Sequence, residues 1–249
     1  MTWEIYDWLL DRARSESRLR QLLLGLQWSV AELDGVGLCF SPVDAPRTLP
    51  WSGTLLGRSA SELCGWIRSF DAAEACVGAV SVNACINGQR NSALARAQPL
   101  AAGGPGHLRV FAHFAPLLAG AKVVVVGRYP GLEQTFAGVD YRCLERRAAP
   151  GTLPDLASEY LLPEADWVFV AASAIANKSL PRLLESSRGA RVVLMGPSLP
   201  WLAEWADFGV DYLAGVFVRD AAELLHIAAE GGGTRIFDRA VEYRLLAVS

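Results

Sequence analysis

The chain has 249 residues, of which 52% are hydrophobic and 20% charged, and its formal net charge is −3. This composition is typical of a globular protein and excludes intrinsic disorder, and the slight acidity gives no electrostatic reason to expect nucleic acid or an anionic membrane as a partner. No apolar run approaches the roughly 18 residues that a membrane span needs, and the first residues lack the basic region of a signal peptide. We therefore expect a cytoplasmic protein with one large domain or two small ones.

Five cysteines are present, an odd number, and no Cys-x-x-Cys pair occurs. Most of them lie in apolar segments, which indicates reduced thiols inside the core. The chain has only two lysines, Lys122 and Lys178, so each is easy to probe chemically. The cysteines are Cys39, Cys64, Cys76, Cys85 and Cys143.

The first sixty residues favour a helix followed by a small antiparallel unit. Residues 2–26 carry an apolar stripe at helical spacing and predict one amphipathic helix. Two apolar runs, 28–33 and 36–40, flank Asp34-Gly35, and an Asp-Gly pair between such runs is a hairpin signal. Residues 41–58 are rich in Pro, Gly and Ser and predict a loop.

Two helix starts follow this loop. Ser59 and Asp71 are each followed three residues later by a glutamate, which is the spacing of a capping box. The second helix, over 75–87, is apolar on nearly all sides and is therefore expected to be buried. Asn83 inside it has two interpretations: it satisfies backbone groups of the core, or it projects a polar group into a cleft.

The C-terminal half alternates strands and helices, which predicts a parallel sheet. Four valines at 123–126 predict a strand that is buried on both faces, and Gly127 then allows a sharp turn into a helix. Residues 97–107 break all periodicity, so we predict an α+β domain over 1–105 and a doubly wound α/β domain over 106–249. The other expected strands are 140–145, 165–172, 190–196 and 212–218, with a last edge strand at 242–248, and the expected helices are 110–118, 132–137, 154–162, 180–187, 199–208 and 220–230.

Six motifs of the C-terminal half, taken in order, are specific as a set, and two shorter stretches carry the match of the N-terminal half. They are residues 66–69, 82–84, 126–130, 144–146, 161–166, 176–180, 196–198 and 209–215. In this order they resemble the putative heavy-metal chelation family, whose Rossmann-like domain matches the C-terminal half and whose enolase-N-terminal-like domain matches 1–105. The resemblance covers nearly the whole chain. It implies this two-domain fold and a connection to a metal ion or a metal chelate, and it does not imply a reaction.

The motif loops lie where strands end, and open α/β sheets bind their ligands at the carboxyl edge of the strands. Gly127, Arg128 and Tyr129 follow the first strand, and they offer backbone N–H groups and a cation to an anionic ligand. Glu145 lies 18 residues after Gly127 (145 − 127), near the spacing of a ribose-binding acid, with pairing to an arginine as the alternative. The two glycines of this loop are four residues apart and do not match GxGxxG, so NAD is not expected.

Two further loops supply the remaining candidates. Lys178 is a candidate Schiff-base or anion-binding lysine, with a solvated or locally paired lysine as the alternative. Ser179 and Ser198 are candidate helix caps or ligand contacts. A strand order of 3-2-1-4-5 brings the loops of strands one and four together, whereas 2-1-3-4-5 places Lys178 near Gly127. The residues after the third and fourth strands are Asn177, Lys178, Ser179, Gly196, Pro197 and Ser198.

Metal ligation has little support from the residues themselves. His107 and His113 are six apart and do not share a helix face, and His226 lies in an apolar helix. No HxxxH, HExxH or Cys-pair motif occurs.

Three functions fit these residues. We expect a protein that binds a small anionic molecule or a metal complex between its domains. The first alternative is an enzyme of the lyase or transferase type that uses Lys178 or Glu145, with Asn83 from the other domain. The second is an interaction module without a ligand. Eight tryptophans and the high apolar content also favour a homodimer.

Overall fold

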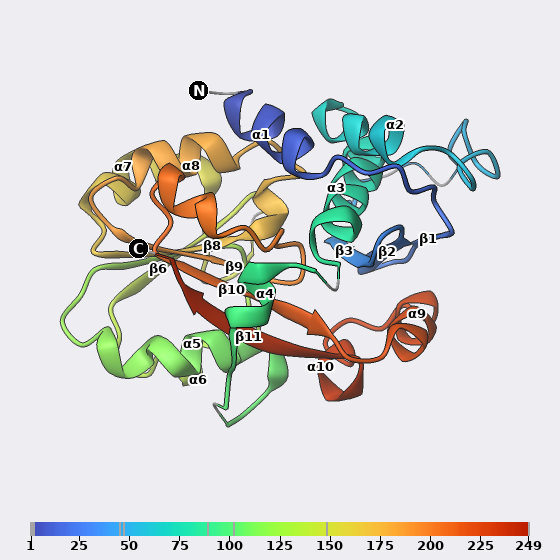
Figure 1. Ribbon diagram of the computed structural model, residues 1–249. Coiled ribbons are helices and arrows are strands. Elements are labelled where there is room, and N and C mark those ends of the chain that lie inside the picture. Colours follow the sequence, from blue (N-terminus) through green and yellow to red (C-terminus); the bar gives the residue numbers. More distant parts are fainter. Residues whose placement is uncertain are drawn as a thin grey trace.

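The computed structural model describes residues 3–44, 46, 48–88, 90–101, 103–147 and 149–248. A small antiparallel sheet with its helices lies beside a large, mainly parallel sheet (Figure 1). This arrangement confirms the α/β fold class with a smaller N-terminal α+β domain.

The first helix is shorter than its sequence pattern predicts. α1 spans Glu4–Arg12, and β1 follows at Gln21–Leu24. β1 pairs antiparallel with β2 (Trp28–Glu32), which pairs in turn with β3 (Val36–Phe40). The expected single helix over 2–26, whose first residue lies outside the described part, is therefore wrong, because the leucines of β1 pair with a strand instead of extending the helical stripe.

Both expected helix caps of the N-terminal domain are present. The hydroxyl of Ser59 accepts a hydrogen bond from a backbone N–H of α2 (Ala60–Gly65), which continues into the 3-10 helix η1 (Trp66–Arg68). The carboxylate of Asp71 accepts two such bonds at the start of α3 (Ala72–Ile86). As expected, α3 is buried along most of its length.

Two glycines allow α3 to approach its neighbours closely. A Cβ on Gly37 of β3 would lie 2.3 Å from the carbonyl oxygen of Val80, and a Cβ on Gly78 would lie 1.9 Å from the backbone nitrogen of Ile67. Both distances are far too short for a real carbon atom. Only glycine therefore permits α3 to pack against β3 on one side and η1 on the other.

The large sheet has eight strands in the described part of the chain. They are β4 (Gln98–Pro99), β5 (Val123–Val126), β6 (Tyr141–Glu145), β7 (Leu153–Pro154), β8 (Trp167–Ala171), β9 (Arg191–Met195), β10 (Tyr212–Val218) and β11 (Val241–Ala247). Their spatial order is β4-β11-β10-β9-β8-β5-β6-β7. β5 pairs in parallel with β6 and β8, and β9 pairs in parallel with β8 and β10. The five expected main strands are thus arranged 2-1-3-4-5.

Helices cover both faces of this sheet. They are α4 (Ser92–Arg96), α5 (Arg109–Phe114), α6 (Leu132–Thr135), α7 (Ser158–Leu161), α8 (Leu180–Ser186), α9 (Ala221–Ala229) and α10 (Ile236–Arg239), with 3-10 turns η2 (Gly106–Leu108), η3 (Ala115–Leu117), η4 (Asp155–Ala157), η5 (Leu162–Glu164), η6 (Ala172–Ala174) and η7 (Ala203–Phe208). α5 and α6 lie on one face, and α7 and α8 lie on the other (Figure 1). Val123 and Val125 pack into the apolar core on one face of the sheet, whereas Val124 packs into the core on the other face, so β5 is buried on both faces as expected.

The expected helix over 199–208 is largely wrong. Only the 3-10 helix η7 forms there, because residues 199–202 form no helix and place Trp201 against β10. The indole N–H of Trp201 donates to the carbonyl of Val216 at 3.1 Å, and its ring lies 2.9 Å from where a Cβ on Gly215 would be. A helix would remove Trp201 from this contact.

The segment between the domains also differs from the expectation. Gln98 and Pro99 form β4 and pair with β11, so the chain joins the large sheet inside the expected linker. β11 therefore has neighbours on both sides and is not an edge strand. The domain boundary between residues 105 and 106 stays a prediction.

Candidate functional site

The strand order places the loops after β5 and β8 side by side, at the switch point of a doubly wound sheet. Gly127 follows β5 with a φ of 108°, a backbone conformation that favours glycine. A Cβ on Gly127 would lie 3.2 Å from the Cβ of Ala171, the last residue of β8. The alternative that brings the loops of strands one and three together is therefore the correct one.

The loop after β5 is a weaker anion site than its glycines suggest. α6 has only four residues after its N-cap, Gly131, so it contributes little helix dipole. The ring of Tyr129 packs edge-on against Phe111, with centroids 4.7 Å apart, and burial raises the pKa of its hydroxyl. Arg128 is exposed, and among the described residues its guanidinium has no hydrogen bond or ion pair. Arg128 is thus the side chain of this loop that can meet an anion.

Glu145 joins two of the loops through their backbones. Its carboxylate accepts hydrogen bonds from the N–H of Arg128 at 3.0 Å and from the N–H of Arg146 at 2.8 Å. The expected alternative, an ion pair with an arginine side chain, is not found in the described part of the chain. Much of the acceptor capacity of Glu145 is used on N–H groups, so this residue positions the loops after β5 and β6.

The loop after β8 contains an unusual backbone conformation. Lys178 has a φ of 66°, and it is the only non-glycine residue with a positive φ in the described part of the chain. Asn177 precedes it, and its Oδ1 accepts hydrogen bonds from the N–H of Ser179 at 3.0 Å and from the hydroxyl of Ser179 at 2.6 Å. Ser179 is therefore at the N-cap position of α8, but its side chain bonds Asn177 and does not cap the helix. Strain of this kind often accompanies a functional position.

The amine of Lys178 is partly removed from solvent. Its Nζ donates to the carbonyl of Ala176 at 2.9 Å, and no carboxylate pairs with it among the described residues. Burial lowers the pKa of Lys178 to about 8, while the neighbouring Cys39 acts in the opposite direction. A lysine in this state supplies both a cation and a usable neutral amine near neutral pH.

The loop after β9 contacts the N-terminal domain. The hydroxyl of Ser198 accepts a hydrogen bond from the N–H of Phe40, at the end of β3, at 2.9 Å. Ser198 therefore holds the two domains together, and the expectation that it caps a helix is wrong. Pro197 is buried beside it. Gly196 is also buried and has a φ of 112°, yet a Cβ placed on it would meet no atom within 4 Å. Open space therefore lies where a side chain at this position would begin.

Two thiols meet at this joint, and sequence reasoning missed them. The Sγ atoms of Cys39 and Cys76 lie 3.4 and 3.8 Å from the same carbonyl oxygen, that of Phe40. The contact with Cys76 and burial raise the pKa of Cys39 well above its ordinary value. These cysteines come from β3 and α3, 37 residues apart (76 − 39), so no local spacing could indicate their meeting.

Asn83 satisfies a backbone group of the core, which was the first of its two expected roles. Its Nδ2 donates to the carbonyl of Leu38 in β3 at 2.7 Å, and the residue is only 1% exposed. Its Oδ1 has no hydrogen-bond partner among the described residues. Asn83 thus fixes β3 on α3 and retains one unused acceptor.

Further contacts close the joint between the domains. The side chain of Asn87 bonds the backbone of Trp201 at 2.8 Å, and the hydroxyl of Tyr6 donates to the carbonyl of Ile175 at 2.9 Å. An ion pair between Arg147 and Asp44 connects the loop after β6 with the loop after β3. The joint between the domains is therefore held by polar contacts on several sides.

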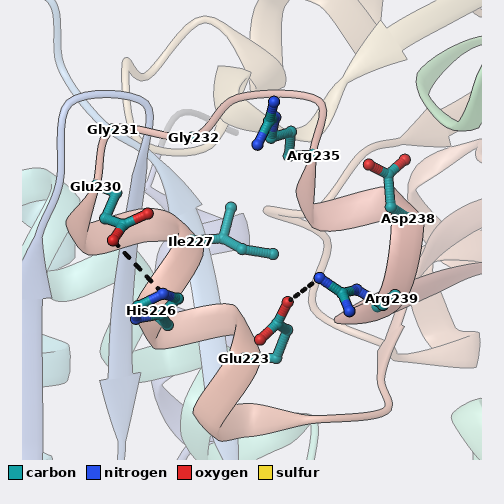
Figure 2. Close-up of a pocket in the computed structure, with 9 residues that line it drawn as sticks. All are labelled: Glu223, His226, Ile227, Glu230, Gly231, Gly232, Arg235, Asp238 and Arg239. Atoms are coloured by element: carbon teal, nitrogen blue, oxygen red, sulfur yellow. Dashed lines mark ion pairs between the residues drawn. The ribbon is translucent and has the colours of Figure 1, made fainter.

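Two surface hollows lie away from these loops. One, of about 380 Å³, lies between α9 and α10 and includes His226 and Arg239 (Figure 2). His226 lies 3.5 Å from Glu230 and Arg239 lies 3.2 Å from Glu223, whereas Arg235 and Asp238 also line this hollow. The other, of about 350 Å³, lies between α1 and α8. Neither includes a residue that the sequence proposed for ligand binding.

No group of three or more His, Cys, Asp and Glu side chains in the described part of the chain is arranged to hold a metal ion. His107 instead lies with its Nε2 3.0 Å from the carbonyl oxygen of Pro130. Among the described helices, none combines the length and the apolar character that crossing a bilayer requires.

Comparison with known proteins agrees with the architecture. Two family models match the chain, one over residues 6–86 and one over residues 109–247, and both carry the description "Putative heavy-metal chelation". The chain belongs to this family. The match confirms the resemblance that the motif loops indicated, and it gives both domains the same family description.

Solved structures of two relatives have the same fold. A protein of unknown function from Desulfitobacterium hafniense has 30% sequence identity and a TM-score of 0.88, with 99% of this chain and 98% of that chain covered. A protein of unknown function from Pyrococcus horikoshii has 18% identity and a TM-score of 0.78, with 99% and 100% covered. Both are assigned to the family of the C-terminal match. A search of curated proteins found no match.

Proposed function

We propose that this protein binds a small anionic molecule, or a metal complex of one, at the carboxyl edge of the large sheet where the two domains meet. The observation that carries the proposal is Lys178, a half-buried amine in a strained loop at the switch point, with one backbone carbonyl as its partner. An unpaired cation at such a position favours an anionic group. The family description, which names heavy-metal chelation, supports a ligand that carries a metal.

Two other features support an anion site beside Lys178. Arg128 offers a second cation from the neighbouring loop, and the buried Gly196 faces empty space. Glu145 and Asn177 hold the loops through backbone contacts, so that Lys178 and Gly127 keep their conformations. In this proposal Ser198 and Asn83 act indirectly, because both fix β3 beside the site. Tyr129 and Pro197 shape the buried walls of the two loops.

Equilibrium binding tests the proposal. Inorganic phosphate, pyrophosphate, citrate and zinc citrate are titrated into the wild-type protein and into Lys178→Met. The matched control is Lys122→Met, because Lys122 precedes β5 at the opposite edge of the sheet and pairs with Glu164. At least one of the four compounds should bind the wild type and Lys122→Met equally and bind Lys178→Met about tenfold or more weakly, the loss expected for one charge-assisted contact. Equal binding to both variants would contradict the proposed site.

An enzyme is the second candidate, and the lowered pKa of Lys178 specifically favours it. A neutral lysine amine attacks a carbonyl compound to form a Schiff base with loss of water. Pyridoxal phosphate followed by borohydride reduction should then label Lys178 and leave Lys122 unlabelled. An absence of adduct at Lys178 would exclude this version.

Localisation and assembly form the last part of the proposal. The cysteines are free thiols, which suits a reducing compartment such as the cytoplasm. We propose a homodimer because Leu156 and Tyr160 at the β7 edge are 77% and 81% exposed. Light scattering of the wild type and of a Leu156→Glu, Tyr160→Glu variant tests this, since only the wild type should have twice the mass of the chain.

A further inference from the structure

A second pair of cysteines lies outside the site described above. Cys64 in α2 and Cys85 in α3 place their sulfur atoms 3.9 Å apart. Cys64 is buried, whereas Cys85 is partly exposed, so an ion or a reagent can reach the pair from solvent. Cys85 lies nine residues, or about 13 Å along the helix, from Cys76 at the joint between the domains.

The separation of the two sulfur atoms matches metal ligation. A zinc–thiolate bond is about 2.3 Å long, so two thiolates on one tetrahedral ion lie about 3.8 Å apart. A disulfide would require the same two atoms to approach to about 2.05 Å. The observed 3.9 Å, which in the metal-free protein is a thiol–thiol hydrogen bond, also fits two ligands that share one tetrahedral ion.

The electrostatic surroundings of the pair favour a cation. Cys85 is the penultimate residue of α3, and the C-terminal end of a helix stabilises positive charge. The N–H of Gly35 donates to the carbonyl of Ala84 at 2.9 Å, which holds the β2–β3 hairpin and its Asp34 at this helix end. The negative charge of Asp34 acts on Cys64, and a cation bound by the two sulfur atoms would offset that charge.

We propose that Cys64 and Cys85 form a two-thiolate site for a soft divalent metal ion with tetrahedral coordination, such as cadmium. Since no third ligand is arranged nearby among the described residues, the ion must be one that thiolates hold strongly, which excludes hard ions such as Mg²⁺ and Ca²⁺. A divalent ion with two thiolates is neutral, which suits a partly buried site, whereas a monovalent ion leaves a negative charge beside Asp34. This site is independent of the proposed anion site at Lys178.

Titration of the reduced, metal-free protein with Cd²⁺ tests the inference. Binding is measured by the ultraviolet charge-transfer absorption of thiolate-bound cadmium and by the number of protons released. The wild type should bind one ion at this site and release at least one proton. Cys85→Ser should lose this absorption and bind the ion at least tenfold more weakly. Cys76→Ser is the matched control, because it changes a cysteine of the same helix that belongs to the other pair, and it should retain the site.

Alkylation of the wild type keeps the test valid if Cys85→Ser does not fold. One equivalent of Cd²⁺ should protect Cys85, the partly exposed thiol of the pair, from N-ethylmaleimide and leave the rate at Cys143 unchanged. Binding that survives in Cys85→Ser, binding that disappears only in Cys76→Ser, or a reduced wild type that binds no Cd²⁺ would each overturn the inference. So would a pair that reoxidises to a disulfide in air and shows no protection by the metal.

Discussion

The amine of Lys178 should titrate far below an ordinary lysine. Its pKa is lowered from 10.5 to about 8 because burial disfavours the charged form. At pH 7 an amine with a pKa of 8 is about 9% neutral, against about 0.03% for an ordinary lysine, which is a ratio of about 300. A less basic amine is also a weaker nucleophile. If the logarithm of its rate constant falls by about 0.4–0.5 for each unit of pKa, as it does for thiols, the expected gain in labelling is reduced to about 15- to 30-fold.

Pulsed acetylation with peptide mapping measures this effect, because the chain gives only two lysine-containing sites to compare. Trace acetic anhydride is applied at a series of pH values, with N-acetyl-lysine present as a free reference amine. Labelling of Lys178 should reach its midpoint near pH 8 and exceed that of the reference at pH 7, and the signal should be absent from Lys178→Arg. A midpoint above about pH 10 would refute the reasoning that burial controls this amine.

Three further predictions concern stability and the contact between the domains. Gly78→Ala should lower the free energy of unfolding by about 3 kcal/mol or more, because the new Cβ would meet backbone atoms. Gly65→Ala is the control, because a Cβ there has open space and should change the stability little. Equal denaturation midpoints for the two variants would contradict this packing. Ser198→Ala should lower the free energy of unfolding by about 1–3 kcal/mol, because the Phe40 amide loses its acceptor. Hydrogen exchange of that amide should become faster, and unchanged exchange would argue against the contact. Between about pH 8 and pH 10.5 the folded state holds Lys178 neutral while the unfolded chain still binds the proton, so stability should rise with pH in this window, and Lys178→Met should remove the rise.

Local signals predicted much of the fold. The valines of β5, the Asp-Gly hairpin and the two helix caps depend on neighbouring residues, so the sequence was sufficient for them. The failures concern long-range contacts. Residues 21–24 form a strand because β2 offers them a partner, and residues 199–202 form no helix because Trp201 packs against Gly215. No local pattern contains either partner.

The candidate site was predictable in position but not in detail. Parallel strands bring their carboxyl ends to one edge, so the loops of Gly127 and Lys178 could be expected together once the strand order was known. The roles of Glu145 and Ser198 could not be predicted, because each bonds a backbone N–H of a segment that the sequence does not place beside it. The thiol pairs depend in the same way on how β3, α2 and α3 pack.

The most direct test of the central claim is the mass of the protein isolated without added ligand, measured under native and under denaturing conditions. The account predicts that the native wild type carries an extra mass, that of a small acidic compound or its metal complex, and that this mass is absent from Lys178→Met and present in Lys122→Met. Identical native and denatured masses for the wild type, together with no binding of phosphate, pyrophosphate, citrate or zinc citrate, would contradict the account.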